Sequence, residues 1–222
     1  MKYSAVILLA GKSSRFNGDV NKVYYEINNK PIFSYALDKF IEDQRCEKIV
    51  LVYNECDKKL LDKYHFVDNK IVFTKGGNER YISVLNGLKS VETQYVLVHD
   101  GARPFITAKM IDDVVLALKT NECVSVGLLM TDTFKRKNQR NNSLETVSRE
   151  GLYSVQTPQG CKTELLVSAL NKVCKNDIIT DDLMAIEKYT NVIPEIVIGD
   201  KRNIKVTTKE DIELIQMFLN NI

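Results

Sequence analysis

Glycine and basic residues follow the first apolar segment of the chain, a pattern that suits the binding of phosphate groups. The run Ala5–Ala10 is followed by Gly11, Arg15 and Lys22. Small residues let backbone N–H groups approach phosphate oxygens, and Arg and Lys supply full positive charge. The same residues are also compatible with an ordinary turn. Neither G-x-G-x-x-G nor G-x-x-x-x-G-K-[ST] is present, so a dinucleotide-binding fold of that type and a P-loop NTPase are both poorly supported.

Another apolar segment, Tyr95–Asp100, ends in a carboxylate. At the carboxyl end of a central strand, Asp100 could hold Mg²⁺ that bridges nucleotide phosphates, or it could cap the next turn and pair with Arg103. The neighbouring His99 is a candidate base, but its place beside a buried strand favours a histidine whose hydrogen bonds are satisfied in the core. With two histidines in the chain, His65 and His99, a multi-histidine metal site is excluded.

Arg80 lies near the N-terminus of a predicted helix, which is a natural anion site. Further basic residues are Arg149 and Lys205, and each alone is typical of a solvated surface charge. Their arrangement is more informative, because Arg80 and Lys205, like Arg15 and Lys22, follow or flank predicted strand ends. Open α/β sheets bind their ligands at that edge. Cations, a glycine-bearing turn and one carboxylate suit phosphoryl or nucleotidyl transfer, in which positioning and charge stabilisation carry most of the catalysis.

The elements that position these residues are predicted from short apolar runs that alternate with amphipathic stretches. Near-continuous hydrophobicity indicates strands buried on both faces, and therefore a mostly parallel, Rossmann-like α/β sheet flanked by helices. The expected strands are Ala5–Ala10, Lys48–Tyr53, Lys70–Lys75, Tyr95–Asp100, Cys123–Leu129 and Glu195–Gly199. The expected helices are Ile32–Ile41, Asp57–Tyr64, Ile82–Ser90, Ala108–Lys119, Thr163–Val173, Asp182–Tyr189 and Lys209–Leu219.

The polar stretch Lys135–Ser148 interrupts this alternation. Its composition is compatible with a solvated loop or with a projecting hairpin, and order there would require contacts from elsewhere, such as a second subunit.

Composition narrows the class of protein. The 222 residues include 31 Lys and Arg against 29 Asp and Glu, a formal charge of +2, so neither a nucleic-acid arm nor a polybasic membrane patch is expected. Five cysteines without a C-x₂-C spacing disfavour a disulfide framework and a zinc site, and they favour a reducing cytoplasm. No apolar run reaches the ~18 residues of a membrane span.

Taken together, the motifs resemble those of the cytidylyltransferases that act on polyol phosphates, in the same order and over nearly the whole chain. Each motif is weak alone, but the ordered set is specific. The matching segments are Leu9-Ala10-Gly11 with Arg15 and Lys22, Gly76-Gly77 with Arg80 and Ser83-Val84, His99–Pro104, Asp132–Lys135, Ser148–Tyr153, Gln156–Gln159, Thr180–Asp182 and Asn203–Thr207.

The resemblance implies a single domain over residues 1–222 of the nucleotidyltransferase type, an enzyme that uses CTP and Mg²⁺. Within it, residues 132–153 would form a β-arm that embraces a second subunit, so that Arg149 completes a site across a homodimer. The polyol phosphate would attack the α-phosphorus of CTP. The implied site residues are Arg15, Lys22, Arg149 and Lys205 for catalysis, Ala10, Gly11, Gly77, Ser83, Asp100 and Ala102 for CTP, Arg103 and Thr133 for the polyol phosphate, and Asp100 for the metal.

The resemblance favours 2-C-methyl-D-erythritol 4-phosphate, an isoprenoid precursor of the non-mevalonate route, as the acceptor. Ala102 before Arg103 and the Asp-Thr-x-Lys segment at 132–135 support it. Phe105 and the segment 153–156 also occur in the sister group that acts on ribitol 5-phosphate for wall polymers, which is the main alternative. A sugar-nucleotide uridylyltransferase and a non-catalytic nucleotide-binding regulator are further alternatives.

The sequence departs from the family pattern around Lys22. The usual Pro-Lys-Gln is replaced by Asn21-Lys22-Val23, and Ser13 stands where a second glycine is common. These changes bear on the rigidity of the first loop more than on the catalytic groups.

Overall fold

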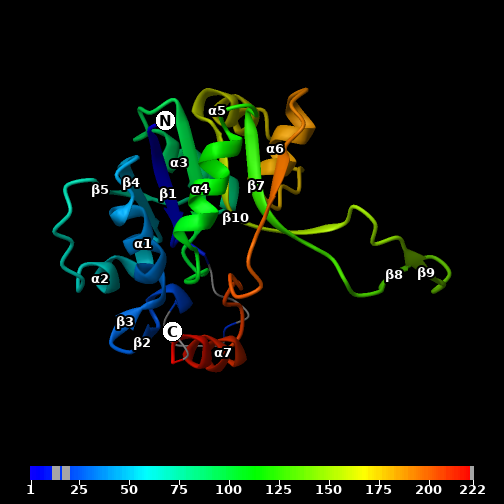
Figure 1. Ribbon diagram of the computed structural model, residues 1–222, viewed down its shortest axis with the longest axis horizontal. Helices are drawn as coiled ribbons and strands as arrows, with labels where there is room; N and C mark the ends of the chain where they lie inside the picture. The colour runs from blue at the N-terminus through cyan, green and yellow to red at the C-terminus, as the bar shows by residue number, and fades with distance from the viewer. Residues whose placement is uncertain (12–15, 17–20, 221–222) are drawn as a thin grey trace.

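A seven-stranded mixed sheet forms the centre of the computed structural model, which describes residues 1–11, 16 and 21–220 (Figure 1). The strand order is β11-β7-β10-β6-β1-β4-β5, and every neighbouring pair is parallel except the two that involve β10. The mostly parallel α/β sheet is therefore confirmed. The strands are β1 (Tyr3–Leu8), β4 (Cys46–Tyr53), β5 (Ile71–Lys75), β6 (Tyr95–Asp100), β7 (Cys123–Leu129), β10 (Tyr153–Lys162) and β11 (Glu195–Ile198).

Helices cover both faces of the sheet because alternate strand residues point to opposite sides. Ala5 and Ile7 of β1 belong to a cluster with α1 (Ile32–Glu42) and α4 (Ala108–Ala117), whereas Val6 packs on the other side. The second face is covered by α3 (Arg80–Leu88), α5 (Thr163–Asn171) and α6 (Asp182–Tyr189). The last helix, α7 (Glu210–Leu219), lies beyond the carboxyl ends of the parallel strands (Figure 1). None of the helices in the described residues is long and apolar enough to cross a membrane.

Strand β10 is absent from the sequence prediction, and the reason is its composition. It places Gln156, Thr157 and Gln159 in the middle of the sheet, where all three are buried. Polar residues and a proline interrupt the apolar run that normally signals a central strand. Their burial is possible because each side chain is hydrogen-bonded.

Short elements follow β1 and β4, the first two strands of the central sheet along the chain. The 3₁₀ turn η1 (Lys22–Tyr24) precedes the hairpin β2 (Glu26–Ile27) and β3 (Lys30–Pro31). The 3₁₀ turn η2 (Glu55–Asp57) precedes α2 (Lys58–Leu61), so the helix expected over Asp57–Tyr64 is shorter than predicted.

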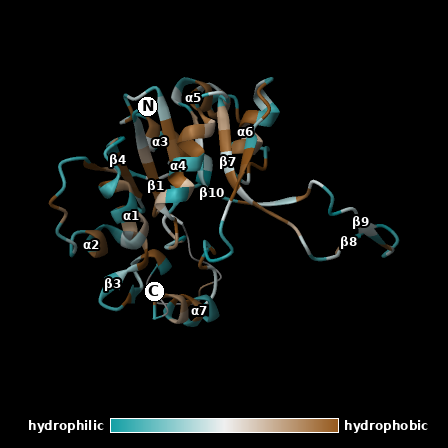
Figure 2. Ribbon diagram, in the orientation of Figure 1, coloured by the Kyte–Doolittle hydropathy of each residue, from teal (hydrophilic) through white to brown (hydrophobic). Residues whose placement is uncertain are grey.

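The polar stretch between β7 and β10 is a projecting hairpin rather than an irregular loop. Strands β8 (Phe134–Lys137) and β9 (Leu144–Val147) pair antiparallel and extend away from the sheet (Figure 1). Figure 2 shows that the hairpin is largely hydrophilic, in contrast to the brown strands of the sheet. We call residues 132–153 the arm.

Candidate active site

A cavity of about 300 Å³ opens at the carboxyl edge of the sheet. It lies where β1 and β6 end, between η1 and the turn that leads into α3. Eight of the predicted site residues line it together. They are Ala10, Gly11, Lys22, Gly77, Ser83, Asp100, Ala102 and Lys205.

The turn before α3 forms one wall of the cavity and is held by Ser83. The Ser83 hydroxyl accepts a hydrogen bond from the Gly77 amide at 3.0 Å and lies 3.2 Å from the carbonyl oxygen of Glu79. A Cβ atom on Gly76 would lie 2.4 Å from the Ala10 side chain, so only glycine allows the turn to approach the first loop this closely. The wall therefore places Gly77 and Ser83 close to the first loop, and Asn78, Glu79 and Arg80 line the cavity beside them.

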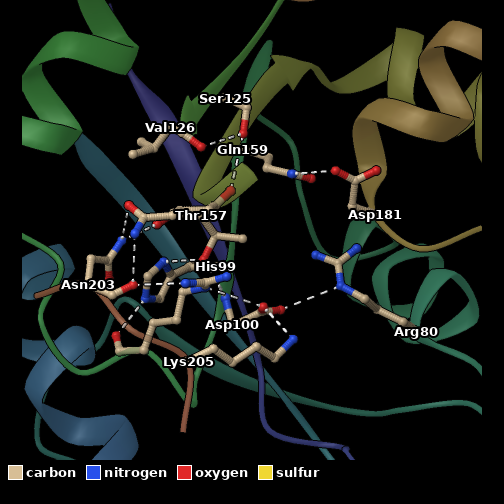
Figure 3. A network of polar contacts seen from close by, with 12 residues as sticks. Arg80, His99, Asp100, Ser125, Val126, Thr157, Gln159, Asp181, Asn203 and Lys205 are labelled. Carbon is tan, nitrogen blue, oxygen red and sulfur yellow. Dashed lines mark hydrogen bonds and ion pairs between the residues drawn. The ribbon is translucent and has the colours of Figure 1, made fainter. Parts of the chain in front are cut away.

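Asp100 is the charge centre of the cavity (Figure 3). Its carboxylate lies 2.7 Å from Lys205 Nζ, 3.5 Å from Arg80 Nε and 3.7 Å from Arg103 Nε. Burial alone would raise the pKa of this carboxyl, but Arg80, Lys205 and Arg103 outweigh burial and hold its pKa far below the usual range. Asp100 is therefore an anion at neutral pH that gathers three cations at the edge of the sheet.

Arg80 connects Asp100 to a second buried carboxylate. Its Nη2 lies 2.9 Å from Oδ2 of Asp182, whose side chain is only 1% exposed. Burial raises the pKa of the Asp182 carboxyl, and Arg80 opposes this rise. The Asp182 amide donates to Gln159 Oε1, and Gln159 in turn donates to Asp181. The sequence places Arg80 at an anion site but shows no sign of this ion pair, which joins residues 102 positions apart.

His99 is a core histidine, not a base in the cavity. Its Nε2 lies 3.0 Å from the Arg103 carbonyl, which can only accept, so Nε2 carries the proton. Nδ1 then accepts from the Thr157 hydroxyl at 3.0 Å, and the same hydroxyl accepts from the Asp100 amide at 3.1 Å. Burial lowers the pKa of His99 to about 4. The neutral ring thus fixes the backbone on both sides of Asp100.

The loop that carries Lys205 is fastened to β10 and to the turn after β6. Asn203 donates to the Thr157 carbonyl at 2.9 Å, and its own carbonyl accepts from Arg103 at 2.8 Å and from Gln156 at 3.3 Å. The amide that follows Lys205 donates to the Ala102 carbonyl at 2.9 Å. Lys205 therefore enters the cavity from a loop that is anchored on both of its sides.

Three predicted site residues lie elsewhere, and one lies outside the described residues. Arg103 is next to the cavity, where it contacts Asp100 and the Asn203 carbonyl. Thr133 and Arg149 are exposed on the arm, and Arg149 donates to the carbonyl of Thr131. Arg15 falls in the part of the chain that the structure does not describe.

The residues of the cavity fit Mg²⁺ that is held mainly by a substrate. Mg²⁺ takes oxygen ligands and usually combines one or two carboxylates with phosphates and waters. Asp100 offers such a carboxylate, and within the described part of the chain its Oδ1 has only the long contact with Arg80. Among the described residues, no three His, Cys, Asp or Glu side chains come together as a metal-binding group. Asp100 as a metal ligand stays a prediction.

Comparisons with known proteins agree with this geometry. The family model of 2-C-methyl-D-erythritol 4-phosphate cytidylyltransferase matches residues 3–221. The curated enzyme of that name from Clostridium novyi is 36% identical over 228 residues, which cover 100% of this chain and 98% of the relative. The one from Clostridium beijerinckii is 37% identical, with 99% of both chains covered.

Solved structures of similarly named proteins match nearly the whole chain. The crystal structure of 4-diphosphocytidyl-2C-methyl-D-erythritol synthase from Anaerococcus prevotii matches with a TM-score of 0.84 and 28% identity, covering 99% of this chain and 98% of that one. The 2-C-methyl-D-erythritol 4-phosphate cytidylyltransferase of Francisella tularensis matches with a TM-score of 0.81 and 28% identity, covering 98% and 99% of the two chains.

Proposed function

We infer that this chain, which belongs to the 2-C-methyl-D-erythritol 4-phosphate cytidylyltransferase family, transfers CMP from CTP to 2-C-methyl-D-erythritol 4-phosphate and releases pyrophosphate. The reaction is a step of the non-mevalonate route to isoprenoid precursors. The structural observation that carries this inference is the cavity that Lys22 and Lys205 line together with Gly77 and Ser83.

In the proposed reaction, an oxygen of the polyol phosphate attacks the α-phosphorus of CTP. The new P–O bond forms as the bond to the β-phosphate breaks, and pyrophosphate leaves with the bonding electron pair. The attacking phosphate is already an anion, so the reaction needs no strong base, in agreement with the core role of His99. Positioning and charge stabilisation carry the catalysis.

The cationic residues act in two groups, one on the α-phosphate of CTP and one on the attacking phosphate. Lys22 and Arg15 stabilise the negative charge that develops on the pentacoordinate α-phosphate. Lys205 and Arg149 hold the attacking phosphate in line, with Arg103 and Thr133 as further contacts to the polyol phosphate. The backbone at Ala10, Gly11, Gly77 and Ala102 and the Ser83 side chain receive the nucleotide. Asp100 supports the proposed role of Lys205 because it holds that ammonium group at 2.7 Å in the cavity.

Mg²⁺ is proposed as the cofactor, with Asp100 as the protein ligand that the cavity offers. When bound, it would neutralise part of the charge of the triphosphate.

The direct test is pyrophosphate release by the purified protein with CTP and Mg²⁺. Parallel reactions contain 2-C-methyl-D-erythritol 4-phosphate or ribitol 5-phosphate, and a third replaces CTP with UTP. We expect release only with CTP and the methylerythritol phosphate. Release only with ribitol 5-phosphate, or only with UTP, would assign the alternative acceptor or nucleotide. No release in any reaction would favour the non-catalytic regulator.

We further propose a homodimer in which the arm completes the partner's cavity. Arg149 and Thr133 lie on the projecting arm and do not line the cavity of their own chain. A second copy of the chain is a partner that would bring them to a cavity, since a two-fold interface repeats the same contact twice.

Complementation tests this arrangement. Lys22→Ala and Arg149→Ala are each expected to lower kcat by about 10²-fold or more. After mixing and subunit exchange, half of the dimers are mixed and one of their two sites is intact, so about a quarter of the wild-type activity should return. Activity that stays at the level of the single variants would place Arg149 outside a shared site, and a fully active dimer after deletion of 134–147 would refute the role of the arm.

A cytoplasmic location is also proposed. All five cysteines are free in the structure, which suits a reducing compartment.

A further inference from the structure

We propose that Asn21 is a positioning residue for Lys22. It would fasten the turn that carries this lysine to the end of β1 and to the neighbouring turn η2. The inference rests on the proposed function, because it assigns Asn21 a role in the reaction through Lys22.

The amide group of Asn21 joins three parts of the structure. Its Nδ2 lies 3.2 Å from the Leu9 carbonyl and 3.0 Å from the Gly11 carbonyl, on either side of Ala10. It also lies 2.7 Å from Oδ2 of Asp57, the last residue of η2. All three contacts have oxygen acceptors, which fixes the amide with its nitrogen toward them.

The oxygen of the same amide organises the lysine turn. Asn21 is the N-cap of η1, and its Oδ1 accepts from the Val23 amide at 3.4 Å. The backbone completes the turn, because the Asn21 carbonyl accepts from Tyr24 at 2.9 Å and the Lys22 carbonyl from Tyr25 at 3.1 Å. One side chain therefore caps the turn from inside and attaches it to the loop after β1.

Asp57, to which the Asn21 side chain is attached, lies in a turn that is itself fixed by hydrogen bonds. Turn η2 is capped in the same way, with Asn54 accepting from Cys56 at 3.1 Å. The strands before the two turns are parallel neighbours, and the Leu9 amide donates to the Val52 carbonyl at 2.8 Å. Asp57 thus offers Asn21 an acceptor whose position is set by the sheet.

This attachment matters because a three-residue turn has little stability of its own. Lysine also carries a long, flexible side chain, so its reach depends on where the backbone is fixed. A displacement of about 1 Å of a charge-stabilising group can lower the rate by about 10²-fold. Asn21 stands at the position where the sequence departs from the Pro-Lys pattern, and its φ of −59° and ψ of 128° are values that proline also adopts.

The first test is a double-mutant cycle with Lys22. We expect Asn21→Ala to lower kcat by about 10- to 100-fold and to change KM for CTP by less than about 3-fold. In a Lys22→Ala background the same change should have little further effect, because the group that Asn21 positions is gone. Asp57→Ala should lower kcat in the same direction, and Asn21→Pro, which fixes φ near its present value, should recover part of the loss.

The matched control is Asn121→Ala. Asn121 also donates its side-chain amide to a backbone carbonyl, that of Ala117 at 2.9 Å, but it lies at the end of α4, away from the cavity. It is expected to lower the midpoint of thermal unfolding slightly and to leave kcat unchanged. If Asn21→Ala instead multiplies the defect of Lys22→Ala, or leaves kcat at the wild-type value, the positioning role is wrong.

Amide hydrogen exchange separates this inference from the proposed function. Asn21→Ala should accelerate exchange at residues 21–25, and Asn121→Ala should not. This readout needs no turnover. A wild-type protein without activity toward either polyol phosphate would overturn the proposed function, whereas unchanged exchange in Asn21→Ala would overturn the attachment itself.

Discussion

The cavity and the arm differ in how their charged side chains are held. Around the cavity, Arg80 lies between Asp182 and Asp100, and Asp100 also contacts Lys205. On the arm, the ion pair of Arg136 and Glu145 has both side chains more than 60% exposed. Charges of the first kind interact strongly and are costly to separate, whereas charges of the second kind are screened by water.

This difference indicates which part of the site a single chain can form. The cavity residues are ordered by the sheet, by β10 and by buried hydrogen bonds, so the cavity itself forms within one chain. The arm holds Thr133 and Arg149 in an exposed hairpin, and the proposed second subunit would give them their place. Changes around the cavity should therefore affect folding and catalysis, and changes on the arm should act mainly through assembly.

The largest effect on stability is expected for Arg80→Met. It leaves the Asp182 carboxylate buried without the arginine that offsets its burial, and breaking such a pair costs about 3–5 kcal/mol. Urea unfolding measures the loss. The control is the double variant Arg80→Met with Asp182→Leu, in which an apolar pair should regain most of the stability. If the free energy of unfolding of the single variant falls by less than about 1 kcal/mol, the ion pair of Arg80 and Asp182 does not stabilise the fold strongly.

A smaller effect, which depends on pH, is expected from His99. Its pKa is about 4 in the fold against 6.5 for the unperturbed group, so the unfolded chain takes up the proton first as the pH falls. The stability contributed by the neutral ring is complete above pH 6.5 and is lost as the pH falls toward 4, by on the order of 3 kcal/mol.

Unfolding free energies measured between pH 7 and pH 4.5 test this expectation. His99→Gln should flatten the slope between pH 6.5 and 5. His65→Gln, at an exposed site, controls for the loss of a histidine. An unchanged slope in His99→Gln would mean that the ring is not the group that titrates.

The sequence predicted those parts of the cavity that depend on local pattern. Apolar runs identified six of the seven strands of the sheet, and the cations after them identified the edge where Lys22 and Lys205 lie. The contacts made by buried polar residues were not predictable. Gln156, Thr157 and Asn203 have the composition of a loop, and only the three-dimensional structure shows that they satisfy one another inside the fold.

The arm could not be predicted from the local sequence pattern. Composition left Lys135–Ser148 open between a loop and a hairpin, and the structure shows strands β8 and β9. A hairpin with exposed polar faces has no apolar alternation to predict it. The family resemblance supplied this prediction, and the assembly that would give the arm its role stays a proposal.

The smallest effect is expected for Arg136→Ala on the arm. The pair with Glu145 at 3.1 Å is exposed on both sides, so its loss should change the unfolding free energy of the monomer by less than about 0.5 kcal/mol. Lys135→Ala, the neighbouring exposed lysine, is the matched control for removing one positive charge from the hairpin. Unfolding followed at several protein concentrations shows whether the arm takes part in assembly. A loss that grows with concentration would place Arg136 in a subunit interface, because assembly then contributes to the measured stability. A loss above about 2 kcal/mol in a chain shown to be monomeric would mean that the arm is held as firmly as the cavity, and the contrast between the two regions would fail.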